Sequence, residues 1–165
     1  MSYPASVIAQ AFVERGIQEG RFVTQMKLQK MVYFAHGYHL AKYSEPLITE
    51  KFEAWKFGPV VQDIYYTYKL YGSDPITDLY FLEEPVKEGW TKGLSASAND
   101  AINYTWKVTN PLSANQLSRW SHLDGSPWAK VYNPEQSSTV ISDESIKAYF
   151  QNILAEKTHE GADKS

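Results

Sequence analysis

Hydrophobic side chains recur every three or four residues along several stretches of the chain, which is the spacing of helices with one buried face. We expect helices over residues 4–18, 25–43, 59–71, 114–124 and 143–155. The stretch 25–43 is apolar around most of its circumference, as is typical of a helix at the centre of a fold, and Thr24 suits its N-cap. Gly37 within it predicts close packing, because a glycine inside a helix costs about 1 kcal/mol relative to alanine.

A shorter stretch, residues 47–57, departs from helical spacing because apolar and polar side chains alternate there. The alternation predicts a small β element, a hairpin of 47–50 with 52–57. Gly58 and Pro59 follow it and mark a turn, after which Pro59 suits the first position of the next helix. The expected fold class is therefore mainly α, a compact helical domain with a central buried helix and a small β element.

Residues 99–110 fit two patterns. Asn99 as an N-cap favours a helix. A strand is favoured by four aromatic or aliphatic residues at alternate positions: Ile102, Tyr104, Trp106 and Val108. Periodicity alone favours the strand.

The composition is that of an ordinary globular chain, with 165 residues, 43% hydrophobic and 21% charged. We expect one domain over 1–155 and a disordered tail over the polar residues 156–165. The absence of cysteine excludes disulfides, thiol catalysis and cysteine-bound metals. No apolar run approaches the roughly 18 residues that cross a bilayer, and no signal peptide is apparent, so we expect a cytoplasmic protein without a membrane partner.

The net charge of −3 and the scattered basic residues make a nucleic-acid partner unlikely. Histidines are the main candidates for chemistry. His36 and His39 share one side of the central helix, with His36 expected to be exposed and His39 to be hydrogen-bonded at the edge of the core. Neither they nor His122 belong to a metal-binding or nucleophile motif, so we expect no metal, no cofactor and no catalytic residue. The open alternatives are a histidine-based enzyme, in which the three histidines converge, and a DNA-binding regulator.

Aromatic residues make up 15% of the chain, and such rings are frequent in both cores and protein interfaces. Tyr66 is expected on the face of its helix that points away from the core, beside Lys69. We therefore predict a partner-binding rim of aromatic and basic side chains: Tyr66, Lys69, Tyr71, Lys56 and Trp90.

Three blocks of the sequence resemble the Panacea domain family of SocA-like antitoxins, which also includes phage-associated proteins. The first block is KLQKMVYFAHGYHLAKY, the second is EAWKFGPV and runs into a helix that ends at Tyr71-Gly72, and a later block includes the segment HLDGSPW. The residues that carry the resemblance include Leu28, Gln29, Lys30, Tyr33, Trp55, Gly58, Pro59, His122, Pro127 and Trp128.

The resemblance implies a mostly helical domain, so at 99–110 it favours a helix over the strand. It implies a non-enzymatic antitoxin that neutralises a cognate toxin by direct protein binding. Some relatives instead deliver the toxin to a protease as adaptors. We interpret the matching residues as a packing signature, with Leu28, Trp55 and Trp128 in the core and the Gly58-Pro59 pair setting backbone geometry.

Overall fold

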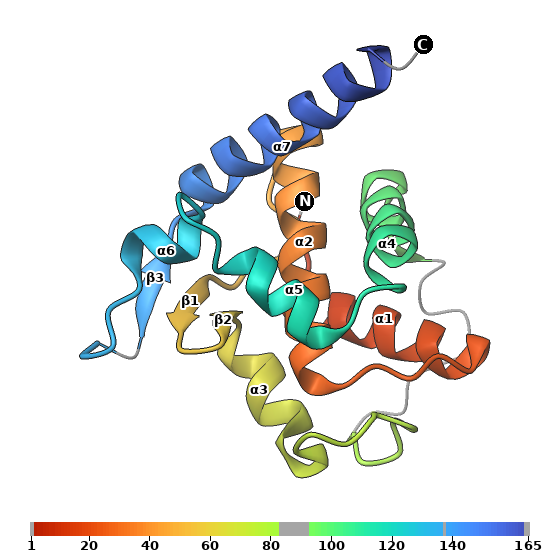
Figure 1. Ribbon diagram of the computed structural model, residues 1–165. Coiled ribbons are helices and arrows are strands. Elements are labelled where there is room, and N and C mark those ends of the chain that lie inside the picture. The colour runs from red at the N-terminus through yellow and green to blue at the C-terminus, as the bar shows by residue number, and fades with distance from the viewer. Residues whose placement is uncertain (1, 83–92, 137, 164–165) are drawn as a thin grey trace.

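Helix α2 (Gln25–Tyr43) runs through the centre of the fold and contacts most of the other elements. The computed structural model describes residues 2–82, 93–136 and 138–163, with side chains described as far as residue 155. The surrounding helices are α1 (Ala5–Glu19), α3 (Gln62–Tyr68), α4 (Ala96–Thr109), α5 (Ala114–Ser121), α6 (Pro127–Val131) and α7 (Asp143–Asp163), with a 3-10 turn, η1 (Lys69–Tyr71), after α3. Figure 1 shows α7 crossing one end of α2, and α1, α4 and α5 beside it.

The sequence of α2 explains its central place. Thr24 caps the helix by accepting a hydrogen bond from the Lys27 amide at 3.3 Å, as predicted. All residues from Leu28 to Leu40 are buried. A β-carbon on Gly37 would lie 2.2 Å from the ring of Phe150 in α7, so the predicted close packing at this glycine is confirmed.

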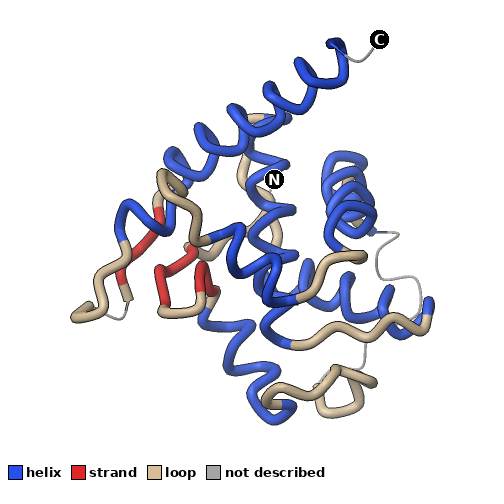
Figure 2. Tube along the Cα trace, in the orientation of Figure 1, coloured by secondary structure: helices blue, strands red, loops and turns tan. Residues whose placement is uncertain are grey.

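The β element is a three-stranded antiparallel sheet in the order β2-β1-β3, small beside the helices that surround it (Figure 2). Strand β1 (Phe52–Trp55) pairs with β2 (Gly58–Val60) through a tight turn, and on its other edge with β3 (Thr139–Ile141). Two details of the prediction are wrong. Residues 47–50 form no strand and make only a bridge from Ile48 to Tyr3, and Pro59 lies in β2 instead of opening a helix.

Residues 99–109 lie within α4 and Asn110 is its C-cap, so the helix implied by the resemblance is confirmed and the strand favoured by alternation is wrong. The Ser95 side chain caps α4 by accepting from the amide of Ala98 at 3.2 Å. The face that α4 buries has helical spacing: Ala98, Ala101, Ile102, Thr105 and Trp106. Helix α7 runs to Asp163, past residue 156 where the disordered tail was expected to begin.

Aromatic rings link α2 to the sheet and to α7. Tyr33 packs edge-on against Phe52 of β1 and Phe150 of α7, with ring centroids 5.3 and 5.6 Å apart. Leu28 and Tyr33 are fully buried, but Trp55 and Trp128 are only half-buried, so their assignment to the core is wrong. No helix among the described residues combines the length and apolar character that crossing a membrane requires.

Candidate protein-interaction site

The turn between β1 and β2 is held by side chains from the segment that contains α5 and α6. Each of its three successive carbonyl groups accepts a hydrogen bond from one such side chain: Trp55 from Trp128, Lys56 from His122, and Phe57 from Ser118. The bond from the Trp128 indole is 2.6 Å long and that from the Ser118 hydroxyl is 3.1 Å. These bonds fix the backbone of the turn while the side chains of Lys56 and Phe57 remain exposed.

The base of the hairpin is tied to α2 by the buried amide of Gln29. Its oxygen accepts from the backbone amide of Val61 at 3.0 Å, and its nitrogen donates to the carbonyl of Val61 at 3.1 Å. One side chain thereby satisfies the buried amide of Val61, which would otherwise be costly to bury, and gives its carbonyl a second donor besides the amide of Tyr65 at 3.2 Å. With the turn bonds, it holds the hairpin at both ends, so the tip is preorganised for binding.

A row of aromatic rings connects the hairpin with α3. The ring of Trp55 packs edge-on against Tyr65 with centroids 5.1 Å apart, and Tyr65 packs in the same way against Tyr66 at 5.3 Å. At the end of the row Tyr66 is 63% exposed, and Phe57 at the tip of the turn is 62% exposed. Large exposed rings on a rigid support are typical of binding hot spots.

An apolar pocket of about 260 Å³ lies between α2, the hairpin and α3. Its lining includes Met26, Lys30, Trp55, Phe57, Val60 and Tyr65. A second, more open hollow shares Met26 and Phe57 and extends to Ser118 and Arg119 of α5. Phe57 therefore borders two hollows that a partner's side chains can enter.

Lys30 is a buried lysine among the residues that line the apolar pocket. It is only 2% exposed, and its ammonium lies against Gly58, where a β-carbon would be 2.6 Å from Nζ. Gly58 has a φ of 119°, so glycine is required here both for conformation and for space. Among the described residues, no carboxylate forms an ion pair with Nζ. Burial lowers the pKa of Lys30 from 10.5 to about 7.

His122 lies close enough to Lys30 for the two charges to interact. Burial lowers the pKa of His122, and the positive charge of Lys30 lowers it further. Its Nε2 is buried without a hydrogen-bond partner among the described residues. The region under the hairpin thus holds a histidine nitrogen without a hydrogen-bond partner and a lysine ammonium without an acidic partner among the described residues.

Comparisons with known proteins identify the family of the chain. The family described as "Antitoxin SocA-like, Panacea domain" matches residues 28–129, more than half of the chain. The chain belongs to this family. It is also 29% identical over 140 residues to Antitoxin SocA of Caulobacter vibrioides (strain NA1000 / CB15N), an alignment that covers 80% of this chain and 72% of the relative. No solved structure gives a significant match.

The residues that carry the Panacea resemblance, although dispersed in sequence, gather around the hairpin. Gln29 holds its base, Trp55 and Gly58 belong to it, and His122 and Trp128 bind its turn. Pro59 lies in β2, and Pro127 begins α6 beside Trp128. Much of this set therefore has a specific packing role, which is to hold the hairpin tip in place.

The structure does not place all of the predicted partner-binding residues on an exposed surface. Tyr66, Lys69 and Lys56 are exposed. Tyr71 is half-buried, donates its hydroxyl to the carbonyl of Asp78 at 3.3 Å and packs on Phe81, so it anchors the loop after η1. Trp90 lies outside the described residues. The sequence reasoning overlooked Phe57, although an aromatic residue in the turn just before Gly58-Pro59 was a visible signal.

The histidines do not form one site. His36 is fully buried, so its expected exposure is wrong; its Nε2 lies 2.9 Å from Asp143, and its Nδ1 accepts from two backbone amides of the 47–48 segment. His39 is hydrogen-bonded at the core edge as predicted, between the carbonyl of Glu45 and the hydroxyl of Ser97. Within the described part of the chain, no three acidic or histidine side chains are grouped as metal ligands.

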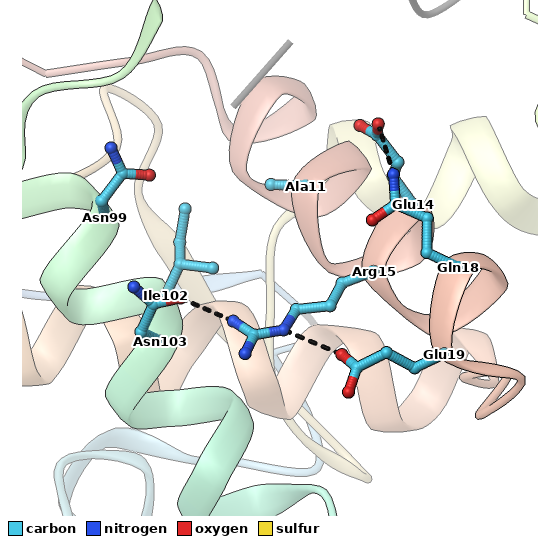
Figure 3. A pocket seen from close by; sticks show the side chains of 8 residues that line it. All are labelled: Ala11, Glu14, Arg15, Gln18, Glu19, Asn99, Ile102 and Asn103. Carbon is cyan, nitrogen blue, oxygen red and sulfur yellow. Dashed lines mark hydrogen bonds and ion pairs between the residues drawn. The ribbon is translucent and has the colours of Figure 1, made fainter. Parts of the chain in front are cut away.

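A further pocket, of about 390 Å³, lies between α1 and α4 (Figure 3). Arg15 reaches across it to Asn103 at 2.6 Å and to Glu19 at 3.0 Å. Glu14 accepts a hydrogen bond from Gln18 at 3.2 Å. Arg15 is already paired with Glu19, and Glu14 is bonded to Gln18, so this pocket is a weaker candidate than the hairpin for binding a partner.

Proposed function

We propose that this protein is a non-enzymatic antitoxin that neutralises a toxin protein by binding it through the hairpin-tip surface, defined as Lys56, Phe57, Tyr66 and Lys69. Membership of the Antitoxin SocA-like family supports the antitoxin role. The observation that carries the choice of surface is the exposed ring of Phe57 on a turn whose three carbonyls are all bonded. An aromatic ring on a fixed backbone loses little conformational entropy on binding, which favours affinity.

The charges around the rings indicate the character of the toxin. Lys56 lies over the ring of Phe57 at 5.6 Å from its centroid, and Lys69 follows Tyr66 by three residues. The tip therefore combines apolar rings with positive charge, although the whole chain is acidic with a net charge of −3. A complementary toxin surface has an apolar centre and an acidic rim.

The test uses the protein encoded beside this chain's gene as the candidate toxin, co-expressed with wild type, Phe57→Ala or Phe22→Ala. Phe22 is a matched control, because it is also an exposed phenylalanine (48%) but lines neither of the hollows that Phe57 borders. Phe57→Ala is expected to weaken binding by about 30-fold or more and to restore toxicity, as for a hot spot of about 2 kcal/mol. Phe22→Ala is expected to bind and protect like wild type.

Circular dichroism and thermal unfolding establish that both variants are folded, since truncation of an exposed side chain changes stability by about 0.5 kcal/mol or less. Wild-type affinity in folded Phe57→Ala contradicts the proposed surface. Failure of the wild-type protein to bind or to rescue growth contradicts the proposed function itself.

Direct blocking and delivery to a protease predict different fates of the toxin. If the protein acts by blocking, the toxin persists in an inactive complex, and its cellular lifetime is unchanged or longer. If it acts as a proteolytic adaptor, the lifetime of the toxin falls when the protein is present. Pulse-chase measurement of the toxin with and without this protein distinguishes the two mechanisms.

A further inference from the structure

The apolar pocket beside Phe57 contains a positive group without a counter-charge. Lys30 lines the pocket and is 2% exposed, and no acidic side chain among the described residues pairs with it. By contrast, Lys51, just before β1, pairs with Asp143 at 3.0 Å. An unpaired buried cation is unusual, because buried charges are normally paired.

We propose that this pocket receives an acidic side chain of the toxin, flanked by an apolar residue, whose carboxylate pairs with the ammonium of Lys30. This inference rests on the proposed function and specifies the chemistry of the partner. Two features of the pocket support it. The ionisable side chains in its lining are Lys30 and the phenol of Tyr65, so the lining contains no acidic side chain. Apolar and aromatic groups dominate the rest of the lining.

The size of the pocket favours a side chain over a separate small-molecule ligand. Its volume of about 260 Å³ is below the range of about 300–1,000 Å³ that is typical of pockets enclosing drug-sized ligands. It also opens next to the exposed ring of Phe57, so a residue that enters it belongs to a protein in contact with the hairpin tip.

The electrostatics of the pocket support the same occupant. Burial lowers the pKa of Lys30 to about 7, so the amine is partly neutral in the free protein at neutral pH. The nearby His122, whose pKa the charge of Lys30 lowers, is also positive when protonated and offers no counter-charge. A carboxylate inside the pocket favours the charged form of the lysine, so binding is accompanied by proton uptake near pH 7.

The first experiment tests the pocket without any toxin. 3-Phenylpropionate is titrated into protein labelled with ¹³C at the lysine ε-carbons, and 3-phenylpropanamide serves as a neutral probe of the same shape. The Lys30 signal is assigned by its loss in Lys30→Met. We expect the acid to bind at least about tenfold more tightly than the amide and to raise the pKa of Lys30, and we expect Lys30→Met to lose this preference.

Lys51→Met is the matched control, because it removes an exposed lysine outside the pocket and should keep the preference for the acid. Equal binding of acid and amide to the wild type overturns the inference, as does a preference that persists in Lys30→Met.

The second experiment measures toxin affinity for Lys30→Met, which we expect to fall by at least about tenfold. Wild-type affinity in the folded variant overturns the assignment of the occupant, even where the acid probe binds. Failure of the proposed function is a separate result, because then the wild-type protein does not bind the toxin at all, whatever the probes do.

Discussion

Replacing Lys30 with methionine removes a buried positive charge and keeps a flexible side chain that can fill similar space. We expect the variant to be more stable than the wild type at neutral pH. The reason is that the native protein holds Lys30 in an environment that disfavours its charged form, with its ammonium against Gly58 and without an acidic partner among the described residues.

The magnitude follows from the pKa of Lys30, which burial lowers from 10.5 to about 7. Each pH unit between these values corresponds to about 1.4 kcal/mol. The lysine therefore lowers the free energy of unfolding by about 4 kcal/mol at pH 7 and by about 5 kcal/mol below pH 6. Between pH 7 and pH 10.5 the unfolded state binds more protons than the folded state, so wild-type stability rises with pH across this window.

The assay is urea unfolding of wild type and Lys30→Met at several pH values from 7 to 10. We expect the variant to be more stable by about 4 kcal/mol at pH 7, equivalent to about 8–16 °C in Tm for a chain of this size, with the difference shrinking toward zero near pH 10. Other titrating groups cancel in the comparison except His122, whose pKa the charge of Lys30 lowers in the wild type alone. A difference that is zero at pH 7, or that does not change with pH, refutes the reasoning, because it would mean that the ammonium is solvated or paired.

Three further substitutions test the packing around the site and the core, each by urea unfolding. Gly58→Ala is expected to lower the free energy of unfolding by about 3 kcal/mol, because the added β-carbon meets Lys30. Gly20→Ala, also at positive φ but with open space around the residue, is expected to cost about 1 kcal/mol. Equal losses would show that space at residue 58 is unimportant. Gly37→Ala is expected to cost about 1–3 kcal/mol, and an unchanged midpoint would mean that α7 shifts freely. Asp143→Ala is expected to cost about 1–3 kcal/mol at pH 7 by leaving buried His36 unpaired. Burial raises the pKa of Asp143, but its bonds to His36 and Lys51 outweigh burial and hold the pKa below 3.8. The cost of Asp143→Ala should therefore shrink as the pH falls below about 4. A cost that does not change with pH would contradict the ionic contribution.

The central helix could be predicted because its burial is visible in its own sequence: an apolar stripe so wide implies neighbours on most sides. Helix α4 shows where this reasoning fails. Tyr104 and Val108, which created the apparent strand pattern, are only half-buried, whereas the fully buried face includes Ala98, Ala101 and Thr105. Small residues contribute little to a hydrophobic pattern, so the face that packs on the core was hidden from it.

The strand pairing of the sheet depends on long-range contacts that no local sequence pattern encodes. Strand β1 pairs on one edge with β3, which lies far along the chain, and the segment after β2 is fixed by the amide of Gln29 from α2. The sequence therefore identified a turn near Gly58 but misplaced the partner strand and the start of α3. Long-range pairing of this kind is set by tertiary structure and not by the propensity of the paired residues.

The candidate site could be predicted only in part, because the burial of its residues also depends on tertiary contacts. Exposed Tyr66, Lys69 and Lys56 could be inferred from helix faces and turn position, but the depth of Lys30 could not. A lysine in a helix is normally solvated, and Lys30 is buried because the hairpin lies over it, with Gly58 in contact with its ammonium.

The burial of Lys30 also bears on why the hairpin is held so firmly. A buried ammonium without a partner destabilises the free protein, and an apolar residue of similar size would fill the space without that cost. The bonds from Gln29, Trp128 and Ser118 hold the hairpin over the lysine in spite of it. An incoming carboxylate then meets a positive charge that is already desolvated and fixed in place, so less free energy is lost in ordering and desolvation when the partner binds. The same arrangement that lowers the stability of the free chain thereby favours the complex, which is the relation expected of a binding surface and not of a core that only packs.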